Sequence, residues 1–101
     1  MTVGLITRFE AWPGKEADVE RTIKAALSVI QKEPGTIAWF PMRLSASTFG
    51  VFDVFPDEES RQAHLSVGER SLRARSMELV EQSLRIEKID ILAAKLPGSG
   101  L

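Results

Sequence analysis

Two residues of this chain have side chains suited to acid–base chemistry. His64 is the only histidine, and Asp53 interrupts the apolar stretch FGVFDVF. An unperturbed imidazole titrates at about pH 6.5, so His64 could act as a general base at neutral pH. A buried carboxylate is costly unless it is paired, so Asp53 is predicted to orient His64, to bind a substrate hydroxyl, or to form a structural bridge with Arg43 or Arg8. The alternative for His64 is a boundary residue that hydrogen-bonds to backbone or water.

Other kinds of site find little support in the sequence. Trp39 and Trp12 could stack on an aromatic ligand, although large aromatic side chains are more often core or interface residues. The chain has no cysteine, which excludes disulfides, thiolate catalysis and cysteine-based metal sites. A lone histidine is weak evidence for a metal site, and no glycine-rich loop stands between a strand and a helix. We therefore predict no metal and no bound cofactor.

Composition limits the class of protein. The chain has 101 residues, of which 44% are hydrophobic and 27% charged, as is typical of one soluble domain. The formal net charge is −1 and the basic residues are spread along the chain, which argues against nucleic-acid binding. Neither a signal peptide nor a membrane-spanning segment is indicated, so we expect a cytoplasmic protein that does not bind membranes.

Hydrophobic periodicity predicts the elements that must position these residues. Strands are expected at 3–12, 36–44, 48–55 and 84–96, and helices at 15–32, 57–67 and 69–82. Gly68 is expected to break or bend the second helical region, Asp57 to cap it, and Pro41 to lie on a sheet edge or at a bulge. The order β-α-β-β-α-β predicts an α+β, ferredoxin-like fold with a four-stranded antiparallel sheet and helices on one face.

The predicted strands are apolar on both faces. Neighbouring residues such as Trp39 and Phe40, or Val51 and Phe52, point to opposite sides of the sheet, as do Ile6 and Phe9 across the first strand. Since the helices cover one face only, we expect a second copy of the chain to cover the other, giving a homodimer. The alternative is a solvated face with scattered apolar residues.

Two segments carry a resemblance to a known family. VGLITRFEAWPGKEADVERTIKAALSVIQKEPGTIAWF and FGVFDVFPDEESRQAHLSV, with the PGK turn, the EPGT exit and the AHL helix in this order, resemble the antibiotic biosynthesis monooxygenase (ABM) family. The resemblance implies a dimeric α+β barrel, with one domain at 1–96 and a tail at 97–101. It also implies a cleft between sheet and helices in which small aromatic substrates are oxidised by molecular oxygen without metal or flavin.

The resemblance also implies roles for individual residues. His64 matches the histidine of the AHL motif, Asp53 lies where many relatives have glutamate, and Phe55 lies where relatives often have tryptophan. After His64 the chain continues SVGERSL, where relatives commonly carry another histidine or an aromatic residue. We expect His64 to accept a proton and Asp53 to orient it. The residues expected to line the substrate site are Trp39, Phe52, Phe55, Arg43 and Met77, although Met77 also suits a core position.

The leading functional prediction is a monooxygenase that acts on a quinol or similar small aromatic. Haem oxygenation is disfavoured because haem-degrading relatives use an asparagine and this chain has none. Two alternatives remain open at this point. One is a non-catalytic dimeric module that binds a small apolar ligand, and the other is an isomerase or dehydratase that works by proton transfer.

Overall fold

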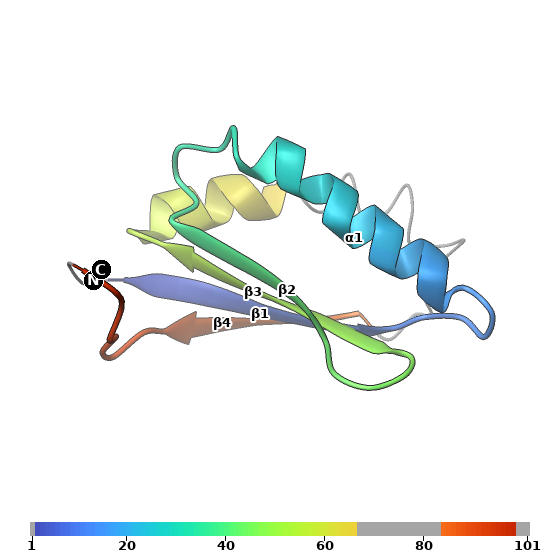
Figure 1. Ribbon diagram of the computed structural model, residues 1–101. Helices are drawn as coiled ribbons and strands as arrows, with labels where there is room; N and C mark the ends of the chain where they lie inside the picture. Colours follow the sequence, from blue (N-terminus) through green and yellow to red (C-terminus); the bar gives the residue numbers. More distant parts are fainter. Residues whose placement is uncertain (1, 67–83, 99–101) are drawn as a thin grey trace.

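The computed structural model describes residues 2–66 and 84–98 and has the predicted ferredoxin-like architecture (Figure 1). Its labelled elements are β1 (Val3–Glu10), α1 (Glu16–Ile30), β2 (Ala38–Arg43), β3 (Thr48–Phe55) and β4 (Arg85–Asp90). A further helix begins at residue 58 and continues through residue 66. The sheet is antiparallel with strand order β2-β3-β1-β4, which confirms the predicted fold class.

The largest difference from the predicted elements is the end of the last strand. It was expected to run to Leu96, but β4 ends at Asp90. The partner of β4 is β1, where Val3 pairs with Asp90 and Thr2 accepts one further hydrogen bond from the Ile91 amide at 3.0 Å. The ladder between β4 and β1 ends there, and residues 91–96 are not part of a strand. The helix predicted at 69–82 lies outside the described residues.

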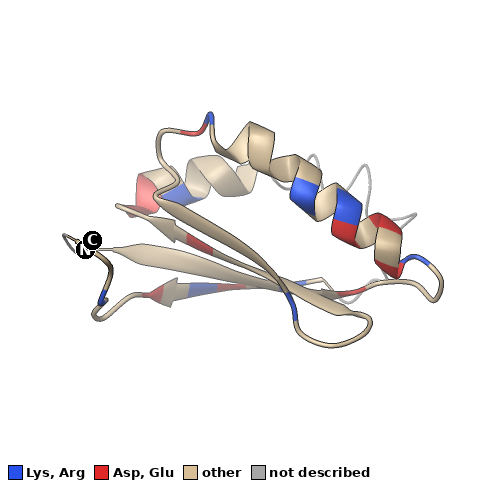
Figure 2. Ribbon diagram, viewed as in Figure 1, with Lys and Arg blue, Asp and Glu red and all other residues tan. Residues whose placement is uncertain are grey.

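Both helical segments lie on one side of the sheet (Figure 1). Their side chains cover two apolar clusters that contain Phe9, Ala11, Val19 and Phe49 at one end and Val3, Leu5 and Phe55 at the other. The charged residues gather along α1 and β4, whereas most of β2 and β3 is uncharged (Figure 2). Within residues 2–66 and 84–98, no helix is long and apolar enough to cross a membrane.

The opposite face of the sheet is apolar and partly exposed over β2 and β3, as predicted, whereas on the side of β4 it carries Glu87 and Arg85. Phe40 is 50% exposed, Leu44 45% and Ile6 39%, and the Phe40 ring stacks on Phe52 with 6.1 Å between centroids. No described helix lies over this face (Figure 1). We refer to Ile6, Phe40, Met42, Leu44 and Phe52 as the open face.

Pro41 lies in β2, which is an edge strand, as its missing amide predicts. It is opposite Val51 in the register, and the neighbouring ladder bond is donated by the Leu44 amide to the Thr48 carbonyl at 2.8 Å. Since ladder bonds along an antiparallel strand recur at every second residue, position 41 faces away from β3. Proline therefore costs the sheet no hydrogen bond here.

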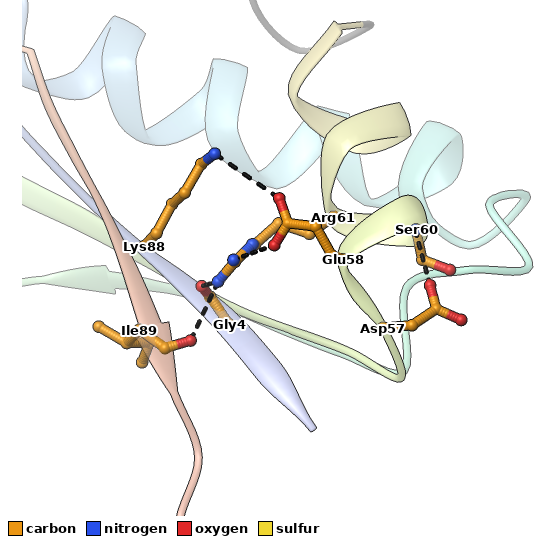
Figure 3. A network of polar contacts seen from close by, with 7 residues as sticks. All are labelled: Gly4, Asp57, Glu58, Ser60, Arg61, Lys88 and Ile89. Atoms are coloured by element: carbon orange, nitrogen blue, oxygen red, sulfur yellow. Dashed lines mark hydrogen bonds and ion pairs between the residues drawn. The ribbon is translucent and has the colours of Figure 1, made fainter. Parts of the chain in front are cut away.

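Arg61 attaches the helix of residues 58–66 to the sheet (Figure 3). Its side chain is buried, and Nη1 donates to the backbone carbonyls of Gly4 at 3.2 Å and Ile89 at 3.1 Å. Nη2 contacts Glu58 on the same helix. The helix begins as predicted, with Asp57 Oδ1 accepting the Ser60 amide at 2.8 Å. One guanidinium thus joins this helix to β1 and β4.

We expect Arg61→Ala to lower the free energy of unfolding by about 2–4 kcal/mol, because it removes charge-assisted hydrogen bonds and buried side-chain packing together. Urea denaturation followed by circular dichroism would measure the change. Arg21→Ala, which removes a guanidinium that is exposed on α1, is the matched control and should have little effect. Equal effects of the two variants would contradict the role assigned to Arg61.

Candidate functional site

His64 lies on the inner side of the helix of residues 58–66 and faces the sheet. The N-cap at Asp57 starts the helix directly after β3, which brings His64 over the end of the strand that precedes it. Its side chain is 14% exposed, and its ring lies 5.2 Å from that of Phe55, between centroids. The histidine is therefore a largely buried residue between helix and sheet.

Asp53 projects from the inner face of β3 toward His64. Its side chain is 3% exposed, and Oδ2 lies 2.8 Å from His64 Nε2. In the register Asp53 is opposite Leu5 on β1 and Trp39 on β2, so apolar side chains flank it on both sides. Neither arginine considered as an alternative partner contacts it: Arg43 pairs with Glu20 at 2.8 Å, and Arg8 belongs to the opposite set of alternating residues on β1.

Glu33 completes the group from the loop between α1 and β2. Its Oε2 lies 2.6 Å from His64 Nδ1 and also accepts the Thr36 hydroxyl at 2.7 Å. Sequence reasoning missed Glu33, because the segment EPG was interpreted only as the end of a helix. Its one signal was an acidic residue beside Pro34, and no periodicity relates it to a residue 31 positions away. We call Glu33, Asp53 and His64 the His64 cluster.

The surroundings of His64 favour its charged form. Burial lowers the pKa of the imidazole, but hydrogen bonds and charge interactions with Asp53 and Glu33 outweigh burial and raise the pKa above its ordinary value. The geometry agrees with this direction, since each ring nitrogen is within hydrogen-bond distance of a carboxylate oxygen. Only an imidazolium can donate to both acceptors at once.

One oxygen of the cluster has no partner among residues 2–66 and 84–98. Asp53 Oδ1 is buried, and none of these residues donates a hydrogen bond to it. A buried acceptor without a donor costs about 1–3 kcal/mol, and more when it is charged. A hydroxyl or amide donor brought to this atom would therefore be bound favourably.

The remaining predicted site residues lie in different parts of the chain. Trp39 and Phe55 share the inner face with Asp53, Trp39 across the ladder and Phe55 two positions along β3. Phe52 is on the open face, stacked on Phe40, because successive residues of a strand point to opposite sides.

Arg43 contacts Glu20, the Ala46 carbonyl and the Phe49 ring, and it lies away from the cluster. Met77 lies outside the described residues. Our candidate site therefore omits Phe52 and Arg43.

The His64 cluster is not shaped as a metal site. The two carboxylates lie at opposite nitrogens of the ring, so their oxygens and the imidazole do not converge on one point. Within residues 2–66 and 84–98, no group of three or more histidine, aspartate or glutamate side chains is arranged to hold a metal ion.

Solved structures show where this fold belongs. The chain is 43% identical to NE2512, a protein of unknown function from Nitrosomonas europaea, over 97% of this chain and 96% of that one, with a TM-score of 0.90. The chain belongs to the NE2512 family. No protein-family model and no curated protein matches the sequence.

Solved structures with lower sequence identity share the fold of this chain. SnoaB, a cofactor-independent oxygenase from Streptomyces nogalater, is 16% identical with a TM-score of 0.74, over 96% of this chain and 98% of SnoaB. A proposed antibiotic biosynthesis monooxygenase from Bacteroides thetaiotaomicron is 15% identical with a TM-score of 0.72, over 97% and 96% of the two chains. These structures confirm the predicted ferredoxin-like α+β fold.

The raised pKa of His64 gives the stability a defined pH dependence. A folded-state pKa above the unfolded value adds stability that is fully present below about pH 6.5 and is lost as the pH rises through the folded pKa. We expect the stability advantage of the wild type over His64→Gln to be largest near pH 6 and to shrink at higher pH. Urea denaturation at several pH values would measure it, and an advantage that does not change with pH would contradict the assignment.

Proposed function

We propose that the protein is a cofactor-independent monooxygenase of the ABM type that oxidises a small aromatic or quinol substrate with molecular oxygen. The observation that carries the proposal is the His64 cluster, in which a buried carboxylate oxygen without a donor lies beside a charged imidazole. Trp39 lies opposite Asp53 in the ladder, on the same face of the sheet, and its half-buried indole offers an apolar surface to an aromatic ring.

The proposed reaction requires few protein groups besides the His64 cluster and the apolar residues beside it. A phenolic hydroxyl loses its proton to the Asp53–His64 pair, and the resulting phenolate can give an electron to oxygen. The phenoxyl and superoxide radicals combine through a new carbon–oxygen bond, and the proton taken up earlier returns to give a ring hydroperoxide. Its O–O bond then breaks as the same ring carbon loses its proton, so that one oxygen atom leaves as water and the other remains as the quinone carbonyl. For a phenol that becomes a quinone, the substrate supplies all the electrons, so no further reductant is required. The dry inner face protects the radical pair from solvent.

The relatives support the proposal at different levels. SnoaB shares the fold and is a cofactor-independent oxygenase, but its identity to this chain is low. NE2512 is much closer in sequence, and its function is unknown. The activity, the substrate class, the absence of a cofactor and the cytoplasmic location are therefore proposals that rest on the site and on the resemblance.

Oxygen uptake is the direct test of this function. With a panel of hydroquinones and naphthoquinols, we expect the protein to accelerate oxygen consumption above the rate of autoxidation without protein. His64→Gln should reduce kcat by about a hundredfold or more, because it removes the charge that supports proton transfer. Glu59→Gln, an exposed change on the same helix, should leave kcat unaltered.

The other outcomes separate the two alternative functions. Conversion of substrate without oxygen consumption would indicate a proton-transfer isomerase or dehydratase. Ligand binding without any turnover would indicate a non-catalytic binding module. Either result would overturn the proposed oxygenase.

We also propose that two copies of the chain pack through their open faces. Large apolar side chains there, including Phe40 at 50% and Leu44 at 45% exposure, would be removed from water by a second sheet. A homodimer made in this way leaves the helices, and with them the His64 cluster, on the outer side of each sheet.

Light scattering coupled to gel filtration would test the assembly. At micromolar concentration the wild type should have about twice the mass of the 11.2 kDa chain. Phe40→Lys should yield a monomer, because it places a charge among the large apolar side chains of the open face. Val29→Lys, an equally exposed site on α1, should remain dimeric. A monomeric wild type would contradict the proposed dimer.

A further inference from the structure

We propose that Glu33 is a positioning residue that holds His64 in its charged form, and that Asp53 Oδ1, instead of His64, accepts the proton of a neutral aromatic hydroxyl. The second part rests on the proposed function, whereas the first concerns the resting protein alone. This exchanges the roles that the sequence suggested for His64 and Asp53.

The first step concerns the number of protons on the imidazole ring. Both nitrogens face carboxylate oxygens, at 2.6 Å for Glu33 and 2.8 Å for Asp53. A neutral imidazole carries one N–H and would leave one carboxylate facing a lone pair, which is repulsive. With both nitrogens protonated, His64 donates to each side and has no lone pair left to receive a substrate proton.

The second step explains why Glu33 stays in place. Its Oε2 accepts the Thr36 hydroxyl as well as the His64 N–H, so the carboxylate is oriented from two sides. Its side chain is only 23% exposed, which limits competition from water. Among the described residues, the charged groups that act on His64 are Glu33 and Asp53, on two different parts of the fold.

The third step identifies the proton acceptor. Asp53 Oδ2 is occupied by His64, whereas Oδ1 is buried and has no donor. Its neighbours Leu5 and Phe55 are fully buried, whereas Trp39 and Val51 are half-buried. A ligand therefore approaches Oδ1 most easily from the side of Trp39 and Val51, where an aromatic ring can lie against the indole.

The charges define the class of ligand. Two carboxylates and one imidazolium give the cluster a net charge of −1, which disfavours anionic rings such as aromatic carboxylates. A neutral phenol or quinol supplies the missing donor to Oδ1. In the transfer, the substrate O–H bond breaks, the proton binds Oδ1 to give a neutral carboxylic acid, and the electron pair remains on the phenolate oxygen. The adjacent imidazolium stabilises that negative charge.

The ionisation of His64 can be measured without any activity. Because the chain has one histidine, ¹⁵N NMR reports both ring nitrogens of His64 without overlap. At pH 7 the wild type should show two protonated nitrogens. In Glu33→Gln the imidazole should titrate at a lower pH, by about one pH unit or more, whereas Glu59→Gln should match the wild type. A neutral wild-type imidazole at pH 7, or an unchanged titration in Glu33→Gln, would overturn the role of Glu33.

The role of Asp53 is tested by anaerobic binding of a matched pair of probes. In a Trp12→Phe background, Trp39 is the only tryptophan, and its fluorescence reports binding of hydroquinone or 1,4-dimethoxybenzene. Asp53→Asn would turn an amide donor toward the ligand, because its oxygen must accept from His64. We expect hydroquinone to bind Asp53→Asn at least about tenfold more weakly, with little change for the dimethyl ether. Equal effects on both probes would overturn the assignment of Oδ1.

These measurements fail independently of the proposed oxygenase. A charged His64 and hydroxyl-selective binding, without oxygen uptake, would refute the oxygenase and leave the roles of Glu33 and Asp53 intact. Oxygen uptake by a protein whose His64 is neutral would refute the role of Glu33 and leave the proposed oxygenase intact.

Discussion

The positive charge of His64, placed between two carboxylates, is what permits a carboxyl group on the buried face of β3. Without that charge Asp53 would be an unpaired anion among Leu5, Trp39 and Phe55. The arrangement needs the helix of residues 58–66 to lie close to the sheet, and the guanidinium of Arg61 holds it there through carbonyl groups of β1 and β4. The helix thus has two sets of polar contacts with the rest of the fold: Arg61 binds backbone carbonyls of β1 and β4, and His64 binds the carboxylates of Asp53 and Glu33.

The sequence predicted the features that depend on residues close to one another along the chain. Hydrophobic periodicity predicted the strands, and Asp53 was singled out because it interrupts the apolar stretch FGVFDVF in β3. The same rule placed Phe52 on the opposite side from Asp53, so including both in one site was inconsistent with a two-residue period. Glu33 could not be found in this way, because its contact with His64 exists only once the loop after α1 lies against the helix of residues 58–66. The end of β4 was missed as well, because the apolar pattern continues past Asp90 whereas the pairing with β1 ends there.

The two faces of the sheet have separate physical properties. The inner face combines apolar packing with a small charged group, whereas the open face has large apolar side chains and the stacked pair Phe40 and Phe52. Because side chains alternate between the faces, changes on one face leave the side chains of the other in place. The sheet can therefore carry chemistry on one side and association on the other with little interference between them.

Pro41 has a consequence for how copies of this chain can meet. An edge strand ordinarily offers a row of backbone donors that another strand can extend, which leads to open-ended growth of the sheet. In β2 the outward-facing position 41 has no donor, so strand addition along this edge lacks a hydrogen bond at its centre. Contact between the same broad face of two copies generates a closed pair, whereas pairing of β2 with β4 of the next copy would extend the sheet without limit. A single imino acid thus biases the molecule toward assemblies of finite size.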